Sequence, residues 1–162
     1  MSYGFEYENY NNEIGGFGDD LDNSNIVLGE RNREVLLHKL TGKYSITNKM
    51  NINLSTRYYW SYSQNNSFFN LQNNGYLSPN GTYSVNQDLN VNSWNFDLSY
   101  SWWFAPGSEF TILYRNYGVQ EVSTIEKSIK NNFNNILNSD LTSILSVSLR
   151  YFIDYNKLKK QR

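Results

Sequence analysis

Cysteine is absent from this sequence, and histidine occurs once, at His38. Without cysteine the chain forms no disulfide bond, thiolate metal site or thiol nucleophile. A single histidine leaves a histidine-based catalytic triad and a two-histidine metal site without their parts. We therefore expect no catalysis and no cofactor, and we interpret His38 as an aromatic-belt or groove-facing side chain on a strand.

Long hydrophobic runs and a large net charge are missing as well. No segment approaches the roughly 20 apolar residues that a membrane-spanning helix needs, which excludes a helical membrane protein. The net charge is -1 and basic residues cluster only in the tail 157–162, so nucleic acid is not an expected partner. The first residues contain no basic region followed by an apolar one, so they do not resemble a signal peptide.

What the sequence has instead is many aromatic residues in a polar chain. It contains 14 Tyr, 9 Phe and 4 Trp, yet its mean hydropathy is -0.65. Apolar and polar residues alternate strictly in several segments, which is the pattern of a strand with two different faces. It predicts strands at about 2–10, 34–47, 50–64, 93–105, 108–118 and 141–155. The longest of them exceed the usual globular strand of about 5–6 residues and match a tilted membrane-crossing strand.

The alternation sorts the side chains into two sets. One set is predicted to form an aromatic belt that faces lipid: Tyr58, Trp60, Trp94, Phe96, Tyr100, Trp102, Phe104, Phe110, Tyr114 and Tyr151. The other set is predicted to be polar and to face a lumen: Arg57, Asp97, Arg115 and Arg150. Transmembrane barrels alternate lipid-facing and lumen-facing residues in this way.

The connections favour a barrel over a soluble β-sandwich, whose strands alternate similarly. Two connections are tight, at 47–50 and 105–108, and three are long, at about 11–33, 63–92 and 119–140. Because short and long connections alternate, every long loop falls at one end of the sheet, as in outer-membrane barrels. The predicted fold is therefore an all-β, antiparallel up-and-down transmembrane β-barrel segment of about six long strands.

Six strands do not close a barrel, since about eight is the minimum, and an unpaired sheet edge is not tolerated in lipid. We therefore expect a fragment, a split gene product or a subunit. The missing strands of the same barrel, or other subunits, would complete it.

The turn at 105–108 predicts a tight hairpin with Gly107 in the left-handed conformation. Centring the turn on Gly107 sets Ser99 opposite Arg115 and makes Asp97 a diagonal neighbour on the same face. We therefore predict that Asp97 and Arg115 interact across this hairpin.

The last long connection contains a capping box, Ser123-Thr124-Ile125-Glu126, followed by apolar residues at helical spacing. It predicts a short amphipathic helix that packs on loops or plugs the mouth of the barrel.

Two groups of carboxylates are candidate sites with a simpler interpretation. Asp19, Asp20 and Asp22 resemble a cation loop but lack complete ligand spacing, which favours a plain solvated loop. A pair among Glu109, Asp97 and Asp154 would suit glycoside hydrolysis only if two acids converged. We interpret these three as lumen charges balanced by arginines.

Three parts of the sequence resemble a known family. They are Arg57-Tyr58-Tyr59-Trp60-Ser61 with Phe68-Phe69-Asn70-Leu71, then Phe104-Ala105-Pro106-Gly107-Ser108-Glu109 with Tyr114-Arg115-Asn116, and the ending 149–156. The family consists of Gram-negative outer-membrane proteins of undefined function, in which a carbohydrate-binding domain of the family-9 type precedes a C-terminal β-barrel. The likeness covers roughly residues 25–160 and implies the end of that barrel. A His is common in the family where Tyr58 stands here.

These observations lead us to expect the C-terminal part of an outer-membrane β-barrel protein, with a structural or transport-related role. The resemblance implies outer-membrane lipid as a partner and polysaccharide bound through an N-terminal domain that this chain lacks. It also implies an outer-membrane location, as part of a longer exported protein. The alternative is a soluble all-β carbohydrate- or protein-binding module, such as a lectin-like sandwich that uses exposed Tyr and Asn in loop 63–92.

Overall fold

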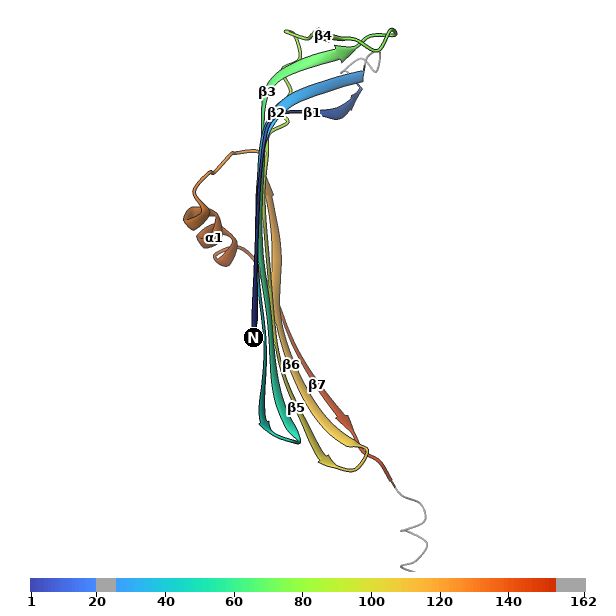
Figure 1. The fold of residues 1–162 in the computed structure, drawn as a ribbon, viewed down its shortest axis with the longest axis vertical. Coiled ribbons are helices and arrows are strands. Elements are labelled where there is room, and N and C mark those ends of the chain that lie inside the picture. The colour runs from blue at the N-terminus through green and yellow to red at the C-terminus, as the bar shows by residue number, and fades with distance from the viewer. Residues whose placement is uncertain (20–25, 154–162) are drawn as a thin grey trace, which may run out of the picture.

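The computed structural model describes residues 1–19 and 26–153, which form one open antiparallel sheet with one short helix beside it (Figure 1). The strands lie in the order β1-β2-β3-β5-β6-β7, and β4 is attached to the far end of β3. Their bounds are Ser2–Asp19 (β1), Ile26–Thr47 (β2), Met50–Leu71 (β3), Leu77–Pro79 (β4), Leu89–Ala105 (β5), Ser108–Val122 (β6) and Thr142–Arg150 (β7). The helix, α1, spans Ile129–Leu137 and precedes β7.

The predicted all-β, antiparallel, up-and-down arrangement is confirmed. Each long strand pairs antiparallel with the next long strand in the chain. Within the described residues β1 and β7 each have one neighbouring strand, so the sheet is not closed. No helix in the described part of the chain is long and apolar enough to cross a bilayer.

The long strands other than β7 extend further than the alternation predicted, whereas β7 ends at Arg150, short of the predicted 155. Most of segment 11–33 was predicted to be a loop, but it belongs to the hairpin of β1 and β2, so that prediction was wrong. This part of the hairpin lacks regular apolar–polar alternation, and polar contacts join its strands, such as those of Glu13 with Arg31 and Arg33. The predicted loop 63–92 is also shorter, since β3 and β5 reach into it.

The register places each predicted set on its own face of the sheet. Directly opposed residues of antiparallel strands share a face. On one face lie the pairs Leu36–Trp60, Tyr58–Trp94, Thr56–Phe96, Tyr100–Ile112, Trp102–Phe110 and Tyr114–Leu145. On the opposite face lie the pairs Arg57–Asn95, Asp97–Arg115 and Glu109–Arg150.

The β5–β6 hairpin turns at Pro106 and Gly107, and the φ of Gly107 is +72°, so its predicted left-handed conformation is confirmed. Proline followed by a positive-φ glycine is the pattern of a type II turn. The turn is one residue tighter than predicted, and a β-bulge in β5 precedes it. Together these shift the pairing by two residues, so Asp97, rather than Ser99, lies opposite Arg115.

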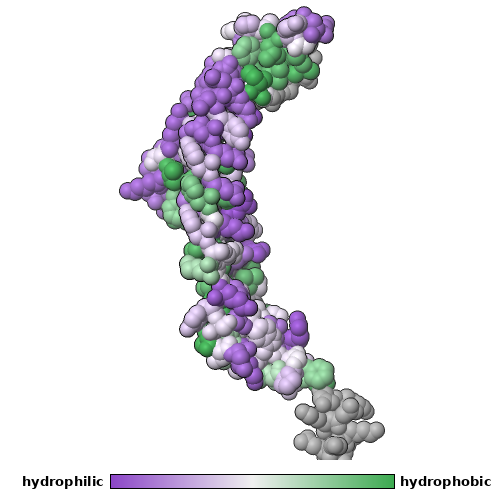
Figure 2. Space-filling view, in the orientation of Figure 1, coloured by the Kyte–Doolittle hydropathy of each residue, from purple (hydrophilic) through white to green (hydrophobic). Residues whose placement is uncertain are grey.

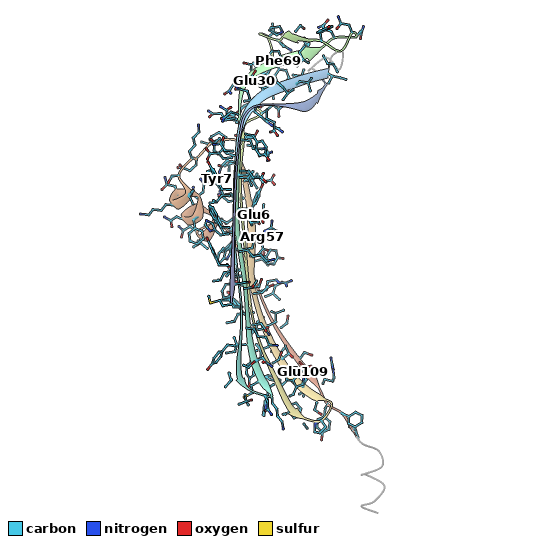
Figure 3. The ribbon with its side chains drawn as sticks, viewed as in Figure 1. Glu6, Tyr7, Glu30, Arg57, Phe69 and Glu109 are labelled. Carbon is cyan, nitrogen blue, oxygen red and sulfur yellow. The ribbon has the colours of Figure 1, made fainter. Side chains whose placement is uncertain are left out.

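The sheet is a single curved layer. Figure 1 shows it nearly edge-on, with both ends bending away from the side that carries α1. The aromatic face, which α1 contacts, is therefore the convex face. In Figure 3, Tyr7 lies toward this side, whereas Glu6 and Arg57 lie toward the concave side, as their alternating register requires.

The predicted helix is present, but it begins at Ile129 and not at the capping box Ser123–Glu126. Ser128 is the N-cap, and its side chain accepts a hydrogen bond from the backbone N–H of Asn131. The Glu126 carboxylate instead accepts from the backbone N–H of Ser128, at 2.7 Å. The helix packs on the convex face of the sheet, and the prediction that it packs on loops or plugs a mouth was wrong.

Candidate functional site

Helix α1 covers the middle of the aromatic face. Tyr58 and Trp60 are 5% and 1% exposed, and Ile136 of α1 is fully buried in the same cluster. Phe133 packs edge-on against both Tyr58 and Trp94, with ring centroids 5.0 and 5.8 Å apart. The predicted aromatic belt is therefore covered by α1 at Tyr58, Trp60 and Trp94, because apolar side chains of α1 lie over them.

A cluster of three asparagines fastens α1 to β5. The Oδ1 atom of Asn132 accepts hydrogen bonds from the side-chain amides of Asn90 and Asn92, at 2.8 and 3.0 Å. The Oδ1 atoms of those two residues accept from Trp60 Nε1 and Tyr58 Oη, each at 3.1 Å. All three asparagines are at most 1% exposed. A buried network whose members are paired admits one arrangement, so it fixes where the helix sits.

Sequence reasoning missed this cluster, although a signal was present. Asn90 and Asn92 occupy positions that continue the aromatic face of β5, where an alternating strand would carry apolar residues. A polar residue on an apolar face needs a partner. Here the partner is Asn132, which lies in another element.

Beside the cluster, an open groove of about 630 Å³ lies between α1 and the sheet. This volume falls within the range of small-molecule binding sites. The groove is lined by Tyr3, His38, Leu40, Thr56, Tyr58, Trp94, Ile129, Lys130 and Phe133. The interpretation of His38 as a groove-facing residue is confirmed.

Most polar atoms in the groove wall are bonded to other protein groups. Tyr3 Oη lies 2.6 Å from Nδ1 of His38, and Tyr58 Oη donates to an asparagine. Trp94 Nε1 donates to another asparagine at 3.0 Å. The charged group among the lining residues is the ammonium of Lys130, an exposed residue of α1. The wall therefore offers mainly ring and methyl surface, with one cation at its rim.

Between α1 and the short turns, the aromatic face is bare. Every residue of β7 is exposed, and Leu145, Val147 and Leu149 keep 68%, 63% and 68% of their surface. Figure 2 shows small hydrophobic patches among hydrophilic residues in the lower half of the sheet, a mainly hydrophilic stretch just above α1, and a larger hydrophobic patch at the top end. Of the predicted belt, Trp102, Tyr114 and Tyr151 are exposed and Phe96, Tyr100, Phe104 and Phe110 are half-buried.

The concave face carries the predicted polar residues. The guanidinium of Arg115 bonds both carboxylate oxygens of Asp97, at 2.7 and 3.0 Å, so the predicted interaction is confirmed. Arg150 lies 3.9 Å from the carboxylate of Glu109. Arg57 lies over the ring of Tyr59, 6.0 Å from its centroid.

A second ionic group lies in the β1–β2 hairpin, where a loop was predicted. The Glu13 carboxylate accepts hydrogen bonds from Arg31 at 3.0 Å and from Arg33 at 3.0 and 3.1 Å. The guanidinium group of Arg33, which has the larger effect, and that of Arg31 hold the pKa of Glu13 below its ordinary value. Arg33 also lies over the ring of Tyr10, 4.2 Å from its centroid.

The candidate cation loop of Asp19, Asp20 and Asp22, and the candidate acid Asp154, lie outside the residues whose side chains the structure describes. In the part that is described, no three of the His, Asp and Glu side chains are grouped so as to hold a metal ion.

The fold and site define a class: a two-faced antiparallel sheet whose convex aromatic face is partly covered by one helix. A protein-family model described as "Domain of unknown function (DUF5916)" matches residues 1–162, and the chain belongs to this family. No curated protein and no solved structure matches it.

Proposed function

We propose that this chain is a segment of a transmembrane β-barrel of the outer membrane, with its convex aromatic face against lipid and its concave polar face toward a lumen. The observation that carries the proposal is the bare apolar part of the convex face, opposite a concave face with charged and hydroxyl side chains. Barrels combine an apolar exterior with a polar interior in this way.

The bare surface is costly in water. Fully burying a Val or Leu side chain contributes about 1.5–3 kcal/mol. Leu145, Val147 and Leu149 keep about two-thirds of their surface exposed. In water, β7 alone therefore lacks about 3–6 kcal/mol of the hydrophobic stabilisation that full burial of these side chains would give. Soluble monomers rarely leave such a stripe uncovered, and lipid acyl chains would cover it.

Strand length gives independent support. A tilted strand crosses the hydrocarbon core with about 9–11 residues, whereas β3 has 22. Its second half, beyond Tyr62, is rich in Ser, Asn and Gln. We place the first half of β3 in the membrane and the second half outside it, on the same side as α1.

The open edges of β1 and β7 require partners in lipid, where unpaired backbone groups are not tolerated. We propose that further strands of the same barrel, or other subunits, pair with them. The role is then structural or transport-related. In the family that the sequence resembles, polysaccharide binding belongs to a different domain, so we assign none of it to residues of this chain.

Single cysteine variants test the proposal, because this chain has no cysteine of its own and cysteines in other parts of the protein can be replaced by serine. Val147→Cys and Ser148→Cys change neighbouring positions on opposite faces of β7. In outer-membrane vesicles that contain the protein expressed from its whole gene, a fluorophore attached at position 147 should be quenched by brominated lipid and resist aqueous quenchers. A fluorophore attached at position 148 should respond in the opposite way. Equal responses from both positions to aqueous quenchers, without detergent, would contradict the proposal and favour a soluble module.

A further inference from the structure

The groove under α1 is built for an apolar ligand. Tyr3 Oη, Nδ1 of His38, Tyr58 Oη and Trp94 Nε1 are bonded to protein neighbours, so most polar atoms of its wall are already paired. A sugar needs several free hydrogen-bond partners, and leaving its hydroxyl groups unpaired costs free energy. A hydrocarbon chain needs only the ring and methyl surfaces that Leu40, Trp94, Ile129 and Phe133 present.

The groove is continuous with the bare part of the convex face. Leu40 and Thr56 form its lower wall, and directly below them along the sheet come Leu54 and its cross-strand neighbour Leu98, which is 40% exposed. An acyl chain lying against the bare face would therefore pass over leucine side chains and enter the groove from below, beside Thr56.

The height of the groove fits the outer border of the membrane. Tyr58 is eight residues beyond the strand start at Met50, which is about 27 Å along β3. With a strand tilt of about 45°, this corresponds to a height of about 19 Å, near the top of an apolar band about 25 Å tall. Lipid headgroups would lie at the level of α1.

The groove lining carries one positive charge, that of Lys130. Lys127 lies elsewhere, 5.2 Å from the ring of Tyr62, and neither residue is among those that line the groove. The first turn of α1 has no acidic residue. The nearby Glu126 carboxylate is negatively charged, but it lies outside the groove lining, where it accepts from the backbone N–H of Ser128 and from Asn131. The rim therefore suits an anionic headgroup.

We propose that the groove binds one acyl chain of an anionic, phosphate-bearing membrane lipid, with the phosphate beside Lys130. The inference rests on the proposed function, because the ligand reaches the groove only if the convex face lies against lipid. The site would anchor a lipid of the leaflet on the α1 side.

Tryptophan quenching by brominated acyl chains tests the proposal in vesicles that hold the full protein. The Trp94 signal is the difference in emission between a Trp102→Phe/Trp103→Phe variant and a Trp94→Phe/Trp102→Phe/Trp103→Phe variant, so the contributions of Trp60, which is 1% exposed, and of tryptophans in other parts of the full protein cancel. The Trp102 signal is the difference between a Trp94→Phe/Trp103→Phe variant and the same triple variant. Brominated phosphatidylglycerol or brominated phosphatidylcholine is added at a low mole fraction to ordinary phosphatidylcholine.

We expect bromine to quench both Trp94 and Trp102. One lysine near a lipid surface favours an anionic headgroup about fivefold, so phosphatidylglycerol should quench Trp94 at about fivefold lower mole fraction than phosphatidylcholine. Lys130→Gln should abolish this preference, whereas the matched variant Lys127→Gln should keep it. Both brominated lipids should quench the emission of Trp102 equally.

A filled groove provides a second, independent readout. Thr56→Phe places a ring in the groove and should remove most quenching of Trp94, while Ile52→Phe, on the same face below the groove, should not. Quenching of Trp102 without Trp94 overturns the inference and leaves the proposed function intact. Quenching of neither contradicts the proposed function itself. Equal quenching of Trp94 by both lipids overturns the proposed headgroup contact.

Discussion

Replacing Asn132 with alanine should detach α1 from the sheet. The side chain is fully buried, and its Oδ1 atom accepts from both Asn90 and Asn92. Its amide also donates to the carbonyl oxygens of Glu126 and Ser128, at 2.7 and 3.0 Å. Alanine would leave two buried amide donors of β5 without their acceptor.

The magnitude follows from the two sides of the balance. Each buried polar group left unpaired costs about 1–3 kcal/mol, so the two donors cost about 2–6 kcal/mol. Burial of Ile136, which is complete, and of Phe133, which is partial, supplies at most about 3–6 kcal/mol to docking, at about 1.5–3 kcal/mol for each fully buried side chain. The penalty is therefore comparable to the docking energy. Even at its lower limit of about 2 kcal/mol, it reduces the ratio of docked to detached helix about 30-fold.

Amide hydrogen exchange of the protein in vesicles measures this ratio. Protection of residues 129–137 should fall about 30-fold or more in Asn132→Ala, while protection of β3 and β5 stays at the wild-type level. Asn135→Ala is the matched control, because Asn135 is exposed on the same helix. Equal protection of α1 in the two variants would refute the idea that the asparagine cluster holds the helix.

Three further outcomes are expected. Because the pKa of Glu13 is lowered, its contribution to the stability of the β1–β2 hairpin is fully present above its ordinary pKa of 4.5 and is lost as the pH falls through the lower folded value. Amide hydrogen exchange in this hairpin should therefore become faster in acid. Glu13→Gln should destabilise the hairpin by about 1 kcal/mol and remove this dependence on pH. Asp97→Arg and Arg115→Asp should each lower the denaturant midpoint in detergent micelles, and the double exchange should restore most of the loss; independent additive effects would contradict a direct pair. Gly107→Ala should lower the denaturant midpoint more than Gly75→Ala. Both glycines have positive φ, but of the two only Gly107 has a neighbour that an added Cβ would meet, the Cβ of Phe152 at 2.9 Å. Equal effects of the two substitutions would rule out that contact.

The strands were predictable from the sequence only where the two sides of the sheet differ chemically. In β3, β5 and β7 one face is mainly apolar, so apolar residues recur at every second position of the sequence. In segment 11–33 that difference disappears, and backbone pairing together with the contacts of Glu13 holds the hairpin. A pattern of hydrophobicity carries no signal for such a strand.

The pairing of Asp97 with Arg115 was predicted from a register that was two residues wrong. A shift of one residue would have moved Asp97 to the other face, but a shift of two keeps every side chain on its face. The tighter turn and the bulge before Gly107 were not visible in composition, because a bulge depends on local backbone geometry. The predicted contact survived because it depended mainly on the faces.

The groove was not predictable, since its walls come from five elements that only the fold brings together. The interruption of the aromatic face by Asn90 and Asn92 was the available signal that something polar covers it. Without three-dimensional contacts, the sequence did not identify Asn132 as that partner. The apolar spacing of α1 predicted a helix but not the surface on which it packs.

The asparagine cluster also constrains where a membrane could lie, independently of strand length. Amide side chains facing hydrocarbon would be costly, and in this fold Asn90 and Asn92 are sheltered from the convex side by α1. Lipid in the proposed barrel must therefore end at or below the helix. The length of β3 between Met50 and Tyr58 leads to the same level, about 19 Å above the short turns. Side-chain polarity and backbone length thus indicate the same upper limit of the hydrocarbon region. A membrane position with α1 inside the hydrocarbon would conflict with both properties.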